Sequence, residues 1–127
     1  MKGWRRQRGQ EGEQLAVAFL QRQGYRIQEQ NYRNRKGEID IIAWDGETLV
    51  FVEVKAKTQT TFGYPEEMVD RRKQRTIVQV AMMYVHRHQL LQTSLRFDVV
   101  AIQLRPGGEP DVTHIPAAFE PAGPFFY

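Results

Sequence analysis

The chain has 127 residues, of which 41% are hydrophobic and 26% are charged, and its formal net charge is +3. This size and composition suit one globular domain with its own core, and no apolar run is long enough to cross a membrane. The lack of cysteine excludes disulfides and thiolate metal sites, so any metal must be bound by oxygen or imidazole. We therefore expect a single domain over residues 1–127, located in the cytoplasm and without a membrane partner.

Basic residues gather in three clusters along the chain, although the net charge is small. The clusters are Lys2, Arg5, Arg6 and Arg8; Arg33, Arg35 and Lys36; and Arg71, Arg72, Lys73 and Arg75. Such clusters suit the phosphate backbone of a nucleic acid. A solvated surface is the favoured interpretation of each cluster taken alone, so only their convergence on one site favours nucleic-acid binding.

The first half of the chain predicts a helix followed by strands. Apolar residues at three- and four-residue spacings predict a helix over residues 11–23, and Gly24 is typical of its end. Runs of β-branched and apolar residues predict strands over residues 25–32, 39–44 and 49–56. The Asp45-Gly46 pair indicates that a hairpin turn joins the last two of these strands.

The second half predicts a long helix, one more strand and a coil. An apolar stripe predicts a helix over residues 65–91, with Pro65 in its first turn. Residues 95–104 predict a strand that lies parallel to the preceding one, because a helical crossover connects the two. We expect residues 105–127 to form an irregular tail anchored by Phe119. The order of elements predicts a three-layer α/β fold with a mixed central sheet flanked by helices.

Charged residues inside the predicted central strands indicate a functional site. Side chains alternate along a strand, so Glu53 and Lys55 share one face with Phe51. If the hairpin loop has an even number of residues, Asp40 lies on that same face, opposite Phe51 or Glu53. Two neighbouring carboxylates repel each other unless a cation lies between them.

This pattern predicts a site for a hard divalent cation. Mg²⁺ prefers oxygen ligands, which Asp40, Glu53 and the backbone carbonyl of Val54 could supply. Lys55 would orient the attacking water and offset charge on a scissile phosphate, which implies phosphodiester hydrolysis. The alternative is an ordinary Glu53–Lys55 ion pair at the surface of an amphipathic strand, and the residues alone leave the two interpretations open.

The pattern of Asp40 followed by Glu53-Val54-Lys55 resembles the D…E-x-K core of the restriction-endonuclease-like superfamily. The chain as a whole is similar to the small YraN-type family within that superfamily. The similar segments are residues 12–25, 30–45, 49–57, 62–75 and 96–102. The resemblance implies a restriction-endonuclease-like fold, similar to that of archaeal Holliday junction resolvases.

The resemblance also implies an active centre of four residues and a metal cofactor. Those residues are Glu13, Asp40, Glu53 and Lys55, and the cofactor is Mg²⁺, for which Mn²⁺ substitutes. Glu13 becomes a ligand of the metal or of its water, although a glutamate near the start of a helix also suits the helix dipole without any function. We expect nucleic-acid contacts from Arg35, Lys36, Lys57 and Lys73. The family commonly has arginine where Lys57 stands, and lysine does not offer the same bidentate contact with phosphate.

The expected function is endonucleolytic cleavage of DNA, selective for branched structures, with a possible homodimer to make paired cuts. Two alternatives remain open at this stage. One is a non-catalytic nucleic-acid-binding module, and the other is a DNA-processing scaffold whose contacts are with proteins. Sensitivity of binding to salt would separate nucleic-acid binding from protein binding.

Overall fold

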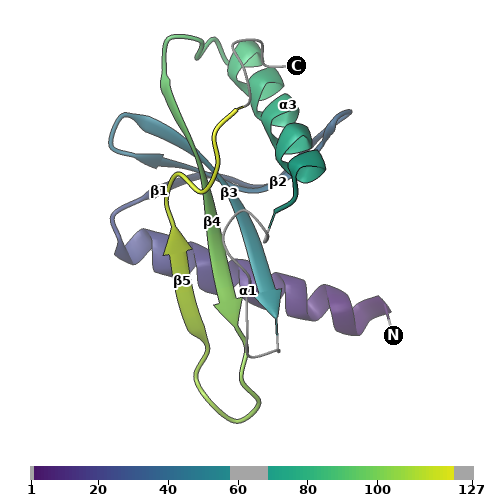
Figure 1. The fold of residues 1–127 in the computed structure, drawn as a ribbon. Coiled ribbons are helices and arrows are strands. Elements are labelled where there is room, and N and C mark those ends of the chain that lie inside the picture. The colour runs from purple at the N-terminus through teal and green to yellow at the C-terminus, as the bar shows by residue number, and fades with distance from the viewer. Residues whose placement is uncertain (1, 58–68, 122–127) are drawn as a thin grey trace.

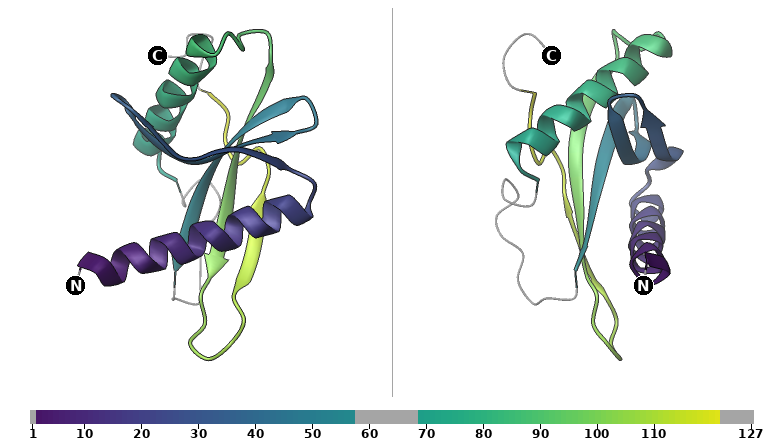
Figure 2. Two further views of the ribbon diagram at one scale, coloured as in Figure 1. Left: turned by 180° about the vertical axis from the view of Figure 1, so that it is seen from behind. Right: turned by 90° about the vertical axis from the view of Figure 1, so that its right-hand side faces the viewer.

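A computed structural model of the chain describes the backbone of residues 2–57 and 69–121, and the side chains from residue 10 onward within these ranges. The elements in chain order are α1 (Lys2–Arg22), β1 (Arg26–Asn34), β2 (Gly37–Asp45), β3 (Thr48–Lys57), α3 (Arg71–Arg87), β4 (Ser94–Gln103) and β5 (Asp111–Ile115). The two helices cover opposite faces of one sheet (Figures 1 and 2). The predicted three-layer α/β arrangement is therefore confirmed.

The sheet has five strands in the order β1-β2-β3-β4-β5. β3 and β4 are parallel, whereas the other neighbouring strands are antiparallel. The parallel pair confirms the predicted crossover, because antiparallel neighbours could be joined by a tight turn but parallel ones need a long connection. β3, which carries Glu53 and Lys55, is consequently the central strand.

The alternation of side chains along β3 separates two parts of the core. Phe51 packs with Tyr84 and Phe97 on the α3 side of the sheet. Val50 and Val52 pack with Leu20 and other apolar residues on the α1 side. Each face of the central strand is buried, so each face packs against its own part of the core.

The loop of the β2–β3 hairpin has an even number of residues, as the predicted site requires. Asp45 pairs with Thr48, so Gly46 and Glu47 form a two-residue turn. Gly46 has φ of 59°, a left-handed conformation that glycine adopts at no steric cost. The predicted hairpin is confirmed, and its turn sets the register of the two strands.

The predicted boundaries of both helices need correction. α1 begins at Lys2 and not at residue 11. Its polar first half has no apolar stripe from which a helix could be predicted, but it lacks proline and contains many residues of high helix propensity. α3 begins at Arg71, where the Asp70 side chain accepts a hydrogen bond from the Lys73 backbone N–H and caps the helix. The expected first turn at Pro65 lies outside the described residues.

The tail was predicted as irregular throughout, and this is wrong. Residues Asp111–Ile115 form β5, which pairs antiparallel with β4 after a turn that contains Gly107 at φ of 72°. The segment is short and lies between prolines, so its alternation was too brief to register as a strand. Phe119 does act as an anchor, since its ring stacks on Phe97 at 5.3 Å between centroids.

Candidate active site

Asp40 and Glu53 lie close together on β2 and β3. The paired register of these strands ends with Ile41 opposite Val52, the residues next to Asp40 and Glu53, and the negative charge of Asp40 acts on Glu53. The Oδ2 atom of Asp40 accepts a hydrogen bond of 2.8 Å from the backbone N–H of Val54. This bond directs the Asp40 carboxylate toward β3. Of the two predicted partners for Asp40, Phe51 is excluded, because it pairs with Ile42.

Glu53 is a buried carboxylate in an unfavourable environment. Its residue is only 7% exposed, in the middle of a sheet whose neighbouring positions are apolar. Burial and the negative charge of Asp40 raise its pKa to about 7, although the charges of Lys73 and Lys55 act in the opposite direction. At neutral pH the Glu53 side chain therefore binds a proton or a cation more readily than an ordinary glutamate does.

The pKa of Asp40 is raised as well, and burial is the main cause. The hydrogen bond from Val54 and the charges of Lys73 and Lys55 oppose this increase, while the charge of Glu38 adds to it. The hydrogen bond and the two lysine charges thus do not offset the effect of burial on Asp40. A divalent cation would relieve the repulsion, because it supplies the missing positive charge.

Two lysines bring positive charge to the carboxylate pair from different elements. Lys55 lies two residues after Glu53 on β3, and its charge lowers the pKa values of both carboxylates. Lys73 lies in the first turn of α3, with its Nζ atom 3.9 Å from Oε1 of Glu53. The Asp70 cap fixes the start of that helix and thereby the direction from which Lys73 approaches.

Glu13 stands beside this group on α1. A Cβ atom added to Gly12 would lie 2.8 Å from Cβ of Ala56, so only glycine allows α1 to lie this close to β3. Burial raises the pKa of Glu13, the charge of Asp40 raises it further, the polar side chain of Asn31 lowers it, and the charge of Glu38 raises it. The helix therefore brings a third carboxylate within electrostatic reach of Asp40.

The described residues contain no group of three or more His, Cys, Asp or Glu side chains placed to hold a metal ion by themselves. The donors that fit a cation best are the opposed carboxylates of Asp40 and Glu53. Mg²⁺ commonly uses one or two carboxylates and completes its shell with water and substrate phosphate, so this donor set suits it. The direct ligand roles of Glu13 and the Val54 carbonyl stay predictions.

The remaining predicted contact residues lie at two edges of the sheet. Arg35 and Lys36 form the exposed turn between β1 and β2, and Lys57 is the exposed last residue of β3. Of the four residues predicted to bind nucleic acid, Lys73 contacts the carboxylate of Glu53. The sequence did not single out Asn31, a residue of low strand propensity within a predicted strand, or Glu38, which directly precedes one.

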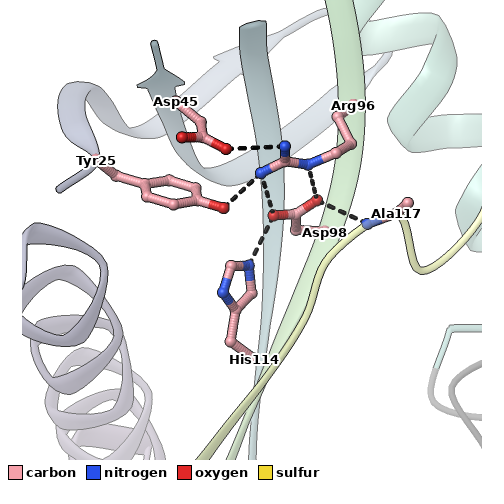
Figure 3. Close-up of polar contacts among 6 residues, drawn as sticks. All are labelled: Tyr25, Asp45, Arg96, Asp98, His114 and Ala117. Carbon is pink, nitrogen blue, oxygen red and sulfur yellow. Dashed lines mark hydrogen bonds and ion pairs between the residues drawn. The ribbon is translucent and has the colours of Figure 1, made fainter. Parts of the chain in front are cut away.

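A second buried carboxylate, Asp98 on β4, lies in a different environment (Figure 3). Asp98 is fully buried and accepts hydrogen bonds from Arg96, from Nε2 of His114 at 2.7 Å and from the backbone N–H of Ala117 at 3.0 Å. Arg96 also bonds with Asp45 and with the Tyr25 hydroxyl. Burial alone would raise the pKa of Asp98, but its hydrogen bonds outweigh burial and lower it.

The family of the chain follows from comparison with known proteins. The model of the uncharacterised protein family UPF0102 matches residues 12–102. The chain belongs to this family. A UPF0102 protein of Anaeromyxobacter dehalogenans is 47% identical over 115 residues, which cover 91% of this chain and 85% of that protein. A UPF0102 protein of Syntrophus aciditrophicus is 50% identical over 100 residues, which cover 79% of each chain.

The part of the chain that matches the UPF0102 model contains the whole candidate site. It begins at Gly12, which lets α1 approach β3, and it includes Glu13, Asp40, Glu53 and Lys73. It ends at Ile102 on β4, so β5 lies beyond it. Neither of the helices that the structure describes in this UPF0102 chain is long and apolar enough to span a membrane.

Proposed function

We propose that this chain is a Mg²⁺-dependent DNA endonuclease with a restriction-endonuclease-like fold. The observation that carries the proposal is the pair of the half-buried Asp40 and the buried Glu53, approached by Lys73 and influenced by the charge of Lys55. Two repelling carboxylates in a central sheet destabilise the apo protein, which is a feature that a metal-binding function explains and a structural role does not. The three-layer fold and the D…E-x-K pattern support the same assignment.

Each residue of the site has a defined part in this proposal. Asp40 and Glu53 hold the cation, and the Val54 N–H keeps the Asp40 carboxylate turned toward Glu53. When bound, Mg²⁺ polarises the scissile phosphate and lowers the pKa of a water molecule. Lys55 orients that water and offsets the negative charge that develops on the phosphate. Lys73 balances the charge of Glu53 before substrate binds and contacts a phosphate of the nucleic acid afterwards.

The proposed substrate is branched DNA, which is supported by the resemblance to archaeal Holliday junction resolvases. The exposed basic turn at Arg35 and Lys36 and the exposed Lys57 supply further positive charge near the ends of β1, β2 and β3. Their contribution should be independent of base sequence, because contacts with phosphates carry no sequence information directly. We therefore expect selectivity for the shape of the DNA.

The test is cleavage of labelled single-stranded, duplex, flap and four-way-junction DNA, and of RNA, with Mg²⁺ or Mn²⁺. Asp40→Asn and Glu53→Gln should each reduce the rate at least about 100-fold, since each removes a ligand charge. The matched controls are Asp111→Asn and Glu47→Gln, which make the same changes at exposed positions. Tight binding without cleavage, or cleavage that the two site variants retain, would contradict the proposal.

A further inference from the structure

The turn between β1 and β2 lies directly against α3 (Figures 1 and 2). A Cβ atom added to Gly37 would lie 2.8 Å from Cγ2 of Thr76 and 3.4 Å from Cγ2 of Val80. The backbone of the turn thus approaches the helix as closely as only glycine allows. Thr76 and Val80 are four residues apart and therefore share one side of α3. The tip of the hairpin is held at a defined place along that side.

Asn34 attaches this turn to the helix and also fixes its backbone. The Nδ2 atom of Asn34 donates a hydrogen bond of 3.3 Å to the backbone carbonyl of Val80. Its Oδ1 atom accepts a hydrogen bond of 2.9 Å from the backbone N–H of Lys36. Asn34 pairs with Gly37, so Arg35 and Lys36 are the two residues of the turn. One side chain therefore sets where this basic turn stands relative to α3.

The attachment brings two basic clusters of the sequence together. Arg72 lies four residues before Thr76, whose hydroxyl donates a hydrogen bond to the Arg72 carbonyl. Arg72 consequently continues the side of α3 that the turn contacts. Arg33 pairs with Glu38 across the hairpin at 2.8 Å, so the Glu38 carboxylate is already bound by an arginine. Three basic side chains are exposed around this contact, and they are Arg35, Lys36 and Arg72.

We propose that the β1–β2 turn and the first turns of α3 form one binding surface for the phosphate backbone of DNA, which leads one strand to the cation site. This inference rests on the proposed function, in which Asp40 and Glu53 hold the metal. Lys73 follows Arg72 and lies 3.9 Å from Glu53, so the surface is continuous with the site. From Arg72 to Val80, α3 is about 12 Å long. This length matches about three phosphates of one strand, which are about 3.4 Å apart along the duplex axis.

The competing explanation is that these basic residues only keep the surface hydrated, and the salt dependence of DNA binding separates the two. The measurement is fluorescence anisotropy of a labelled DNA duplex without divalent metal at several KCl concentrations. Each lost phosphate contact should reduce the slope of log affinity against log salt by about 1. We expect this reduction in each of three variants: Arg35→Gln, Lys36→Gln and Arg72→Gln. Arg87→Gln, the same change at an exposed position in the last turn of α3, should leave the slope unchanged.

A further variant tests whether the attachment of the turn matters. Asn34→Ala removes both hydrogen bonds of the Asn34 side chain but no charge, so a reduced slope in this variant would come from the displaced turn. Because Asn34 acts through Arg35 and Lys36, adding Asn34→Ala to the Arg35→Gln, Lys36→Gln double variant should have little further effect. An unchanged slope in Asn34→Ala, or a fully additive loss in the combined variant, would overturn the positioning role of Asn34.

The outcomes separate this inference from the proposed function. If the three surface variants have the same slope as Arg87→Gln, or if the unaltered protein does not bind the duplex, the binding surface is wrong. Cleavage that depends on Mg²⁺, Asp40 and Glu53 could persist in the first of these cases, and the proposed function would then stand alone. If the slopes fall as expected but no DNA is cleaved with Mg²⁺, the proposed function fails and the binding surface stands.

Discussion

The sheet holds two buried carboxylates, Asp98 and Glu53, and the groups around them differ in their balance of charge. Around Asp98, an arginine, a histidine and a backbone N–H all donate hydrogen bonds to one carboxylate, and its pKa is lowered. Around Glu53, a second carboxylate faces the first, the Lys73 ammonium is 3.9 Å away, and the pKa is raised to about 7. The first group is electrostatically complete within the protein, whereas the second has excess negative charge.

This difference separates a structural role from a functional one. A buried carboxylate with a full set of donors stabilises the contacts between the elements that supply them, here β2, β4 and the segment around β5 (Figure 3). A buried pair of carboxylates that repel each other reduces stability until a ligand neutralises it. The comparison predicts opposite effects on stability when the two kinds of carboxylate are neutralised.

The largest effect on stability should come from Asp98→Asn. It removes the negative charge that Arg96 and His114 contact inside the protein, and breaking a buried ion pair in this way costs about 3–5 kcal/mol. Urea denaturation at pH 7 measures the loss. The control Asp111→Asn removes an exposed ion pair with Arg105 and should cost less than about 1 kcal/mol. Equal losses of stability in the two variants would contradict the structural role of the buried Asp98 carboxylate.

Glu53→Gln should have the opposite sign in the absence of metal. The folded-state pKa of Glu53 is about 7, above its ordinary value of 4.5, so the folded protein binds more protons than the unfolded chain between these values. Its stability therefore decreases as the pH rises through this window. Above pH 7 the variant should be more stable by on the order of 3 kcal/mol, since a tenfold change in proton binding corresponds to about 1.4 kcal/mol.

Below pH 4.5 the advantage of Glu53→Gln should vanish, because Glu53 is then neutral in both states. Denaturation curves for the two proteins at pH 4, 6 and 8.5 without divalent metal test this. The matched variant Glu47→Gln, at an exposed turn position, should show no such dependence on pH. If Glu53→Gln were less stable than the unaltered protein at pH 8.5, the negative charges of Asp40 and Glu53 would already be neutralised within the protein.

Gly12→Ala should disturb the site through the backbone. The new Cβ atom would lie 2.8 Å from Cβ of Ala56, so α1 must shift away from β3, at a cost of about 1–3 kcal/mol. Because Glu13 is the next residue, Mg²⁺ binding should weaken as well. Gly108→Ala is the control, since its Cβ atom would meet Arg105 at an ordinary 3.5 Å. Unchanged stability and metal affinity in Gly12→Ala would show that this close approach is not required.

The smallest effect on stability should come from Lys73→Gln. The lysine side chain is 40% exposed, so its loss should change the free energy of unfolding by less than about 1 kcal/mol. The pKa of Glu53 should nevertheless rise, because Lys73 lowers it in the unaltered protein. Carbon-13 detection of the Glu53 carboxyl group during a pH titration measures this. Arg72→Gln, one position away on the exposed part of α3, should leave that pKa unchanged.

The carboxylate pair could be predicted from the sequence because its geometry is local. Alternation along β3 places Glu53 and Lys55 on one face, and a two-residue turn at Gly46 fixes the register that brings Asp40 near Glu53. The contact of Lys73 with Glu53 could not be derived in this way, because it depends on where α3 begins and how it crosses the sheet.

The Asp98 group was predictable only in part. A buried, hydrogen-bonded carboxylate is the expected interpretation of an aspartate inside an apolar strand, and Asp98 confirms it. Its partner His114 lies on β5, which the sequence did not reveal, so the group could not be assembled. Asn31 escaped notice for another reason, since a left-handed residue within a strand has no counterpart in a periodic pattern.

The most direct test of the account is calorimetric titration of the metal-free protein with Mg²⁺ at pH 8. We predict binding that Asp40→Asn and Glu53→Gln abolish and that Asp111→Asn retains. At a Mg²⁺ concentration ten times the Kd, this binding should raise the free energy of unfolding by about 1.4 kcal/mol. Absence of binding by the folded protein, or equal binding by all four proteins, would contradict the claim that the Asp40–Glu53 pair is a cation site.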